Sequence, residues 1–163
     1  MSISTKEYNL LVDQNGNDLL SYARMMFKGN TGIAEDIVQS TFLYVWKNRE
    51  KIEMQNPRGY LFRTCRNLGI DYLRKYKKED SIGFSIDFII DENDSNPDFW
   101  IKQVIEVMQG CSDQEIEILL LKLRMGMTYQ EISLVLNIST TNVGVILHRL
   151  LTKIKNRVKG ESL

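Results

Sequence analysis

The chain of 163 residues has few of the residues that build metal and redox sites: two cysteines and one histidine. Cys65 and Cys111 lie far apart and form neither a C-x-x-C pair nor a zinc-ligand spacing, and His148 has no histidine near it. One histidine and two scattered thiols do not make an ordinary metal site. We therefore expect no metal and no cofactor, and we interpret both cysteines as small, partly buried thiols.

Long apolar runs are also absent. No apolar stretch approaches the roughly 18 residues of a membrane span, and 26% of the residues are charged. The first residues, MSISTKEYNL, lack the charged head and long apolar stretch of a secretory signal. We expect a cytoplasmic protein without membrane insertion, in which the 43% of apolar residues form a packed core.

The chain also has no formal net charge, because 21 basic residues balance 21 acidic ones. The two signs are nevertheless segregated along the chain. Residues 58–78 hold seven basic side chains and one acid, residues 79–98 hold seven acids and no Lys or Arg, and residues 144–160 hold five basic side chains and no acid. A net charge of zero would argue against a polyanionic partner such as nucleic acid. The two basic segments that flank the acidic one are stronger evidence, and they favour such a partner.

Only two prolines, sparse glycine and the lack of alternating strand patterns predict an all-α protein. We expect N-terminal helices over residues 6–28, with a break at Gly16, 33–48 and 57–77. Asn56 is suited to cap the third of them, and Pro57 to occupy its first position. The acidic stretch that contains Asp94-Ser95-Asn96-Pro97 reads as a linker. The predicted organisation is two small helical domains, residues 1–78 and 101–163, joined by an acidic linker over residues 79–100.

The C-terminal half carries clear helix start and stop signals. Ser112 with Glu115, and Thr128 with Glu131, have the spacing of capping boxes. Asn137 is suited to a left-handed turn, and Ser139 to capping a last helix. A short capped helix, a turn and a longer second helix predict a helix-turn-helix.

In a helix-turn-helix the second helix enters the DNA major groove and reads base edges with its N-terminal residues. Its apolar positions must face the first helix, which leaves several polar positions facing outward. Asn can pair with adenine, Arg with guanine, and Thr with either partner type. The outward side chains with such chemistry are Thr140, Thr141, Asn142, His148 and Arg149.

Residues 57–77, PRGYLFRTCRNLGIDYLRKYK, mix basic and aromatic side chains. Aromatic faces stack unpaired bases while cations follow the backbone, so this mixture suits a nucleic-acid strand whose bases are unstacked. The aromatic side chains of this segment are Tyr60, Phe62, Tyr72 and Tyr76. We interpret Tyr60 and Tyr72 as core residues, and the basic set as a binding surface.

Two blocks resemble a known family. AEDIVQSTFLYVW (residues 34–46) followed by PRGYLFRTCRNLGIDYLRK (residues 57–75) resembles the second conserved region of extracytoplasmic-function sigma factors of the sigma-70 family. CSDQEIEILLLKLRMGMTYQEISLVLNISTTNVGVILHRLLTKI (residues 111–154) resembles their fourth region. The resemblance covers nearly the whole chain and implies a transcription initiation factor that is not an enzyme.

The resemblance also implies partners and site residues. Three residues match the surface that docks on the β′ clamp helices of core RNA polymerase: Asp36, Gln39 and Phe42. Residues 51–56 match a loop that captures a flipped base of the promoter −10 element, with Asn56 as the best candidate. The helix that contacts the −10 element is matched by Arg58, Arg63, Arg66, Asn67, Asp71 and Arg74. The −35 reader is matched by Thr140, Thr141, Asn142, His148 and Arg149, although Gly144 stands where the family often has a basic residue.

The family implies two further partners, the polymerase β flap and an anti-sigma factor. Leu119 and Leu123 are loose candidates for the β-flap contact, although we favour a core role for both. Three other classes of protein remain open at this point. The first is a LuxR-type regulator that acts without core polymerase, which would not need the block at residues 34–75. The second is a nucleic-acid enzyme such as a recombinase, for which no nucleophile or carboxylate cluster is evident. The third is a protein that only sequesters another factor.

Overall fold

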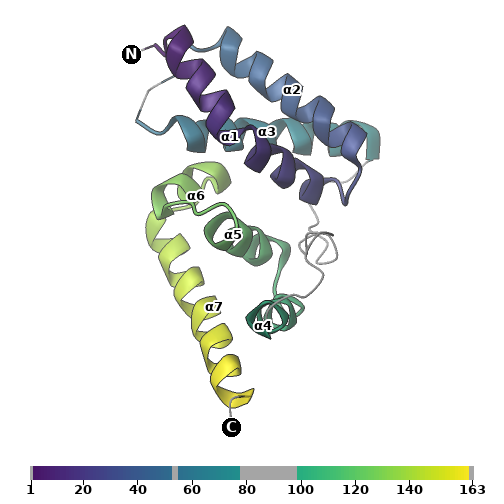
Figure 1. Ribbon diagram of the computed structural model, residues 1–163, viewed down its shortest axis with the longest axis vertical. Coiled ribbons are helices and arrows are strands. Elements are labelled where there is room, and N and C mark those ends of the chain that lie inside the picture. Colours follow the sequence, from purple (N-terminus) through teal and green to yellow (C-terminus); the bar gives the residue numbers. More distant parts are fainter. Residues whose placement is uncertain (1, 53–54, 78–98, 162–163) are drawn as a thin grey trace.

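The computed structural model describes residues 2–52, 55–77 and 99–161, and every regular element within them is helical. Figure 1 shows an upper group of helices from the N-terminal half and a lower group from the C-terminal half. The upper group contains α1 (Thr5–Met26), α2 (Thr31–Lys47), α3 (Pro57–Tyr72) and the π-helical turn η1 (Leu73–Lys77). The lower group contains α4 (Phe99–Met108), α5 (Asp113–Leu123), α6 (Tyr129–Leu136) and α7 (Thr140–Glu161). The predicted all-α fold class is confirmed.

Helix α1 begins at a capping box that the sequence reading missed. The Ser4 hydroxyl accepts from the Glu7 backbone N–H, and the Glu7 carboxylate accepts from the Ser4 N–H at 2.8 Å. The predicted break at Gly16 is wrong, because α1 runs through it without interruption. Leu11 and Leu19 on either side are buried against the other helices, so tertiary packing outweighs the roughly 1 kcal/mol helix cost of one glycine.

Helix α3 begins as the sequence predicts. The Asn56 side chain accepts from the Gly59 N–H at 3.1 Å, and Pro57 occupies the first turn. The α-helix ends at Tyr72 rather than at Lys77, and the last basic residues lie on the π-helical turn. Cys65 is fully buried in this bundle, whereas Cys111 in the C-terminal half is only partly buried as expected.

Helices α5, α6 and α7 make the predicted turns with one exception. Thr128 and Glu131 form a complete capping box, and Asn137 is left-handed with φ 54°. Ser139 accepts from the Asn142 N–H at 3.0 Å. At Ser112 only half of the predicted box forms: its hydroxyl accepts from the Glu115 N–H, but the Glu115 carboxylate binds Arg149 instead.

Helices α6 and α7 meet at a bend of 109°, within the range of a helix-turn-helix. Leu147 and Leu150 of α7 are buried on the side that packs on α5 and α6. In the described part of the chain no single helix is long and apolar enough to cross a membrane, and only this bent pair meets that length and composition together.

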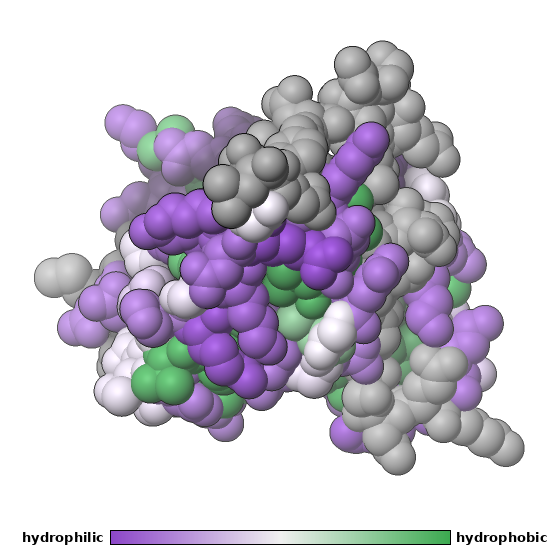
Figure 2. Space-filling model, turned by 90° about the horizontal axis from the view of Figure 1, so that it is seen from below, coloured by the Kyte–Doolittle hydropathy of each residue, from purple (hydrophilic) through white to green (hydrophobic). Residues whose placement is uncertain are grey.

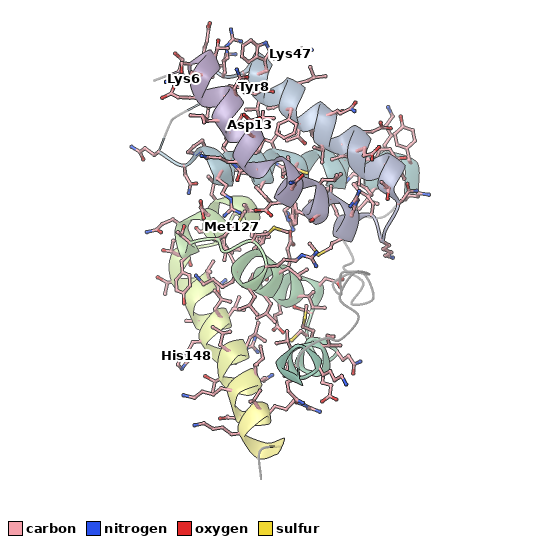
Figure 3. All side chains as sticks on the ribbon, viewed as in Figure 1. Lys6, Tyr8, Asp13, Lys47, Met127 and His148 are labelled. Carbon is pink, nitrogen blue, oxygen red and sulfur yellow. The ribbon has the colours of Figure 1, made fainter. Side chains whose placement is uncertain are left out.

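The two groups of helices pack directly on each other, chiefly through α3 and α6. Met127, just before α6, is fully buried at the junction (Figure 3). A Cβ on Gly59 of α3 would lie 2.9 Å from Cδ2 of Leu134 on α6, which is closer than Cβ atoms approach their neighbours. The two helices therefore approach so closely because position 59 has no side chain.

The predicted linker at residues 79–100 lies outside the described residues, except that α4 begins at Phe99. The short alternating run at residues 81–90 lies outside them as well.

Candidate nucleic-acid interface

The N-terminal turns of α7 present the predicted −35 reader to solvent. Every residue of this set is exposed: Thr140, Thr141, Asn142, His148 and Arg149. Val143 and Leu147, between them, are fully buried and fix which face of α7 points outward. Figure 3 shows His148 pointing away from the neighbouring helices. Exposed donors and acceptors on the second helix are what readout of base edges in the major groove requires.

An ion pair fixes the far end of this surface. Arg149 Nη2 donates to Glu115 Oε1 of α5 at 2.5 Å. Burial alone would raise the pKa of Glu115, but the hydrogen bond and the charge of Arg149 lower it below the ordinary value. Glu115 therefore orients Arg149 along the outer face of α7, and the same engagement explains why its capping box at Ser112 is incomplete.

Part of the basic α3–η1 surface is open to solvent. Asn67, Asp71 and Arg74 are exposed, and Arg63 is partly exposed. Asp71 and Arg74 lie 4.0 Å apart as an ion pair one helical turn from each other. Pairs this exposed stabilise proteins by less than about 1 kcal/mol, so Arg74 can exchange its partner for a phosphate.

The aromatic side chains of this segment divide into core and surface. Tyr60 and Tyr72 pack against the core as predicted. Phe62 is fully buried against Tyr22, so the prediction that it could stack on bases is wrong. Tyr76 is 61% exposed and tilted over Tyr72, which makes it the accessible aromatic face beside the basic side chains.

The candidate base-capture residue, Asn56, is partly buried and uses its side-chain oxygen to cap α3. Its amide NH₂ group is not part of that cap and remains a donor for a base edge. Two residues of the preceding loop, Glu53 and Met54, lie outside the described residues.

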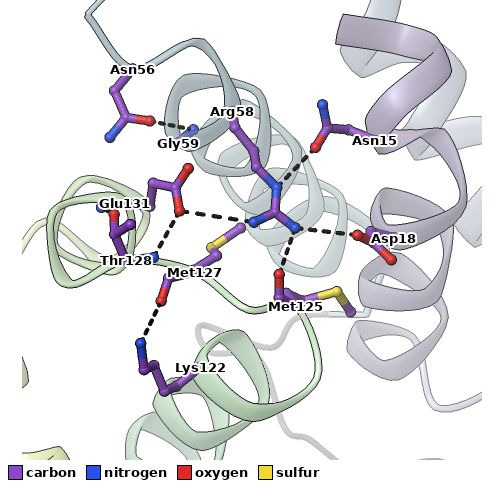
Figure 4. A network of polar contacts seen from close by, with 10 residues as sticks. All are labelled: Asn15, Asp18, Asn56, Arg58, Gly59, Lys122, Met125, Met127, Thr128 and Glu131. Carbon is purple, nitrogen blue, oxygen red and sulfur yellow. Dashed lines mark hydrogen bonds and ion pairs between the residues drawn. The ribbon is translucent and has the colours of Figure 1, made fainter.

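Arg58 and Arg66 are turned toward the C-terminal helices rather than toward open solvent. Arg58 donates to the Met125 carbonyl at 2.7 Å and to Asp18 at 3.2 Å, while Glu131 lies 3.8 Å away (Figure 4). Arg66 donates to Glu117 at 2.8 Å. The structure thus brings together two members of the predicted −10 set with acidic groups of the other half, which the sequence reading did not foresee.

The candidate polymerase surface lies on α2. Asp36 and Gln39 are exposed there. Phe42 is largely turned inward, where it packs against the core and its carbonyl accepts from the Tyr8 hydroxyl at 2.9 Å. Leu43 (58% exposed) extends the outer face instead. The i, i+3, i+7 spacing of Asp36, Gln39 and Leu43 was the signal that could have found it.

The β-flap candidates divide in the same way. Leu119 is 1% exposed and belongs to the core, which is the role that the sequence favoured for it. Leu123 is 48% exposed and stays a candidate.

The end of the molecule that carries the α7 C-terminus is mostly hydrophilic, with hydrophobic residues in small patches between polar ones (Figure 2). Among the described residues no cluster of three or more His, Cys, Asp or Glu side chains could hold a metal ion.

A basic, partly aromatic helix and an exposed helix-turn-helix reader in one chain define a DNA-binding protein of transcription. The family model for Sigma-70 region 2 matches residues 11–79. The ECF RNA polymerase sigma factor SigM of Bacillus subtilis (strain 168) is 29% identical over 143 residues, which are 85% of this chain and 87% of SigM.

Solved structures agree on the fold. The sigma factor RpoE, in complex with the anti-sigma factor NepR from Bartonella quintana, matches with a TM-score of 0.66 and 17% identity, over 95% of this chain and 98% of RpoE. CnrH, in complex with the cytosolic domain of CnrY, matches with a TM-score of 0.61 and 20% identity, over 96% of this chain and 90% of CnrH. The chain thus contains a match to Sigma-70 region 2 and is similar over most of its length to an extracytoplasmic-function sigma factor, which supports the prediction of an alternative sigma factor. The LuxR-type alternative is not favoured, because the region 2 match covers the block that such a regulator would not need.

Proposed function

We propose that this chain is an alternative sigma factor of the extracytoplasmic-function class, which recruits core RNA polymerase to promoters through three separate surfaces. The outer face of α2, with Asp36, Gln39 and Leu43, binds the β′ clamp helices. The α3–η1 surface contacts the −10 element, and the N-terminal turns of α7 read the −35 element. The observation that carries this proposal is the set of exposed polar side chains on α7, a helix set at 109° to α6.

The two promoter elements call for different chemistry. The −35 element is read as duplex, through side-chain donors and acceptors in the major groove. The −10 element must be melted, and capture of an unstacked base offsets a few kcal/mol of the unpairing cost. Two weakly binding units on one chain gain affinity by effective concentration once polymerase fixes their spacing. Free sigma factor should accordingly bind promoters poorly without core polymerase.

We also propose an anti-sigma partner, supported by RpoE and CnrH, which were solved with NepR and with the cytosolic domain of CnrY. Core polymerase and promoter DNA are cytoplasmic, so the chain acts in that compartment. A genuine anti-sigma partner must abolish transcription by this chain when it is added in equimolar amount, and restore it when it is removed.

Run-off transcription with purified core polymerase on fragmented source DNA tests the proposal. Transcripts should appear only when this chain is present. The double variant Arg63→Ala/Arg74→Ala should lose most of them and should lower the salt slope of holoenzyme binding by about two, because each phosphate contact contributes about 0.9.

The matched control is Lys6→Ala/Arg24→Ala, which removes two exposed basic side chains from α1, outside the proposed surfaces. Transcript levels with this control should stay within twofold of wild type. Equal loss in both double variants would show that charge alone, and not the α3–η1 surface, supports initiation.

A further inference from the structure

Val145 of α7 is the most exposed large apolar side chain among the described residues, with 63% of its surface open to solvent. Tyr76 and Leu43 follow at 61% and 58%. A single apolar side chain on a protein surface is ordinary and by itself indicates nothing. The place of Val145 within the helix-turn-helix is what makes this side chain informative.

Val145 lies at the centre of the face that carries the predicted −35 reader. Successive residues of an α-helix are about 100° apart around its axis, so residues two positions away point to nearly the opposite side. Val143 and Leu147 hold those positions, and both are fully buried. The neighbours on the face of Val145 are three and four residues away. They are all exposed, and they are all predicted reader residues: Thr141, Asn142, His148 and Arg149.

Gly144, the residue before Val145, lets the backbone of α7 come close to a ligand on this side. It has no side chain to stand between the helix and DNA, and the ring of Tyr129 from α6 lies beside it. A Cβ at Gly144 would be 3.5 Å from Tyr129 Cε2. The side chain of valine is short, so its methyl groups reach a base edge only where the backbone approaches closely. Glycine favours such an approach.

The valine side chain carries no hydrogen-bond donor or acceptor, and this restricts the base that it can recognise. In the major groove adenine, guanine and cytosine present only donors and acceptors, whereas thymine also presents its C5-methyl group. A valine placed against the polar edge of guanine or cytosine removes these groups from water without replacing their hydrogen bonds, which is unfavourable. Against the methyl group of thymine it buries apolar surface of both partners. The chemistry of Val145 therefore selects thymine.

We propose that Val145 is a specificity-determining residue, which contacts the C5-methyl group of one thymine in the −35 element. This inference rests on the proposed function, since it names the base that one position of the α7 surface recognises. Asn142 and Arg149, on either side of Val145 along the helix, contact the hydrogen-bonding groups of neighbouring bases. One position of the −35 element is then fixed as thymine without any hydrogen bond to that base.

Deoxyuridine provides the test, because it keeps every hydrogen-bonding group of thymine and lacks the C5-methyl group. The start site of a transcript from the run-off assay locates the −35 element of one promoter. Each thymine of this element, on either strand, is replaced singly by deoxyuridine. The affinity of the holoenzyme is then measured from the fluorescence anisotropy of the labelled promoter duplex. With the wild-type chain we expect one replacement to weaken binding about fourfold, which is the value of burying roughly one methyl group.

Two substitutions assign this effect to position 145. Val145→Ser removes both methyl groups from an exposed position and should abolish the difference between thymine and deoxyuridine. Val145→Ile keeps a branched apolar side chain and should keep the difference. The matched control is Leu10→Ser, which removes an apolar side chain that is 47% exposed on α1, outside the proposed surfaces. This control should respond to deoxyuridine as the wild-type chain does.

Three results would overturn the assignment. The first is a deoxyuridine effect of equal size in Val145→Ser and in the wild-type chain, because another residue would then contact the methyl group. The others are a wild-type holoenzyme that is indifferent to deoxyuridine at every thymine, and a −35 element without thymine. Neither of these two depends on how a variant folds. Transcripts without a deoxyuridine effect reject the thymine contact only, whereas a lack of transcripts with the wild-type chain rejects the proposed function.

Discussion

Cys65 on α3 is completely enclosed by the N-terminal helices. Burial raises the pKa of its thiol from an ordinary value of 9.0 to about 12, and interaction with the Thr41 side chain lowers it only in part. The thiolate is the nucleophilic and oxidisable form, so this cysteine stays protonated and inert at neutral pH. The more accessible thiol is Cys111, which is partly buried and also has a raised pKa, with burial as the main cause.

The Cys65 thiol predicts a loss of stability in alkaline solution. The unfolded chain releases this proton near pH 9.0, while the folded chain holds it to about 12. The contribution to stability is therefore complete below pH 9 and declines as pH rises toward 12. Urea unfolding should give a free energy about 1.4 kcal/mol lower at pH 10 than at pH 8 from this group alone.

The control for this prediction is Cys65→Ala, which should be less stable at pH 8 because of the cavity but should lose less stability on going to pH 10. Tyr22, whose pKa burial also raises well above 10.0, acts in the same direction and begins to contribute as the pH approaches 10. An identical pH dependence in both chains would contradict the assignment to Cys65.

Alanine substitution should have opposite effects on stability at two helical glycines, Gly16 and Gly69. A Cβ on Gly16 of α1 would meet nothing within 4 Å. Gly16→Ala should therefore raise the free energy of unfolding by about 0.5–1 kcal/mol, because alanine restricts the unfolded chain and favours a helix. Thermal melting followed by circular dichroism should show a midpoint a few degrees higher.

Gly69 of α3 is the counterpart. A Cβ there would overlap the Met26 sulfur, which is buried between α1 and α3. Gly69→Ala should lower the free energy of unfolding by about 1–3 kcal/mol through overpacking, in spite of its better helix propensity. A neutral Gly69→Ala would mean that Met26 can move aside without cost.

The helix signals in the sequence were local, which is why they predicted so much of the fold. Asn56, Thr128 and Asn137 act on backbone groups three or four residues away, and the structure confirms each of these turns. Ser112 failed in part because Glu115 had a second partner, Arg149, 34 residues further along the chain. The predicted helix break at Gly16 was wrong because the burial of residues on both sides outweighs the low helix propensity of glycine.

The candidate site could be predicted from the sequence only where it depends on the spacing of residues within one helix. The exposed reader on α7 follows from the apolar spacing of that helix. The environment of Arg58 and Arg66 does not, because no periodicity in α3 indicates that Glu117 and Met125 pack against it. Sequence spacing shows which residues share a face of a helix, and it does not show which distant element covers that face.

At the scale of the whole molecule, the buried contacts between the halves should make them unfold together. Scanning calorimetry of the wild-type chain should give one transition with equal calorimetric and van't Hoff enthalpies. Glu117→Gln should give two overlapping transitions, because each half then melts by itself. Two transitions already in the wild-type chain would show that the contact of Arg66 with Glu117 does not couple the halves.

The contact of Arg66 with Glu117 also restricts how these two positions can change. Replacing either residue alone leaves the other charge buried without its partner, which is costly. Replacing both by well-packed apolar side chains of similar volume is often neutral or stabilising. The two positions should therefore be substituted together, although they lie 51 residues apart along the chain.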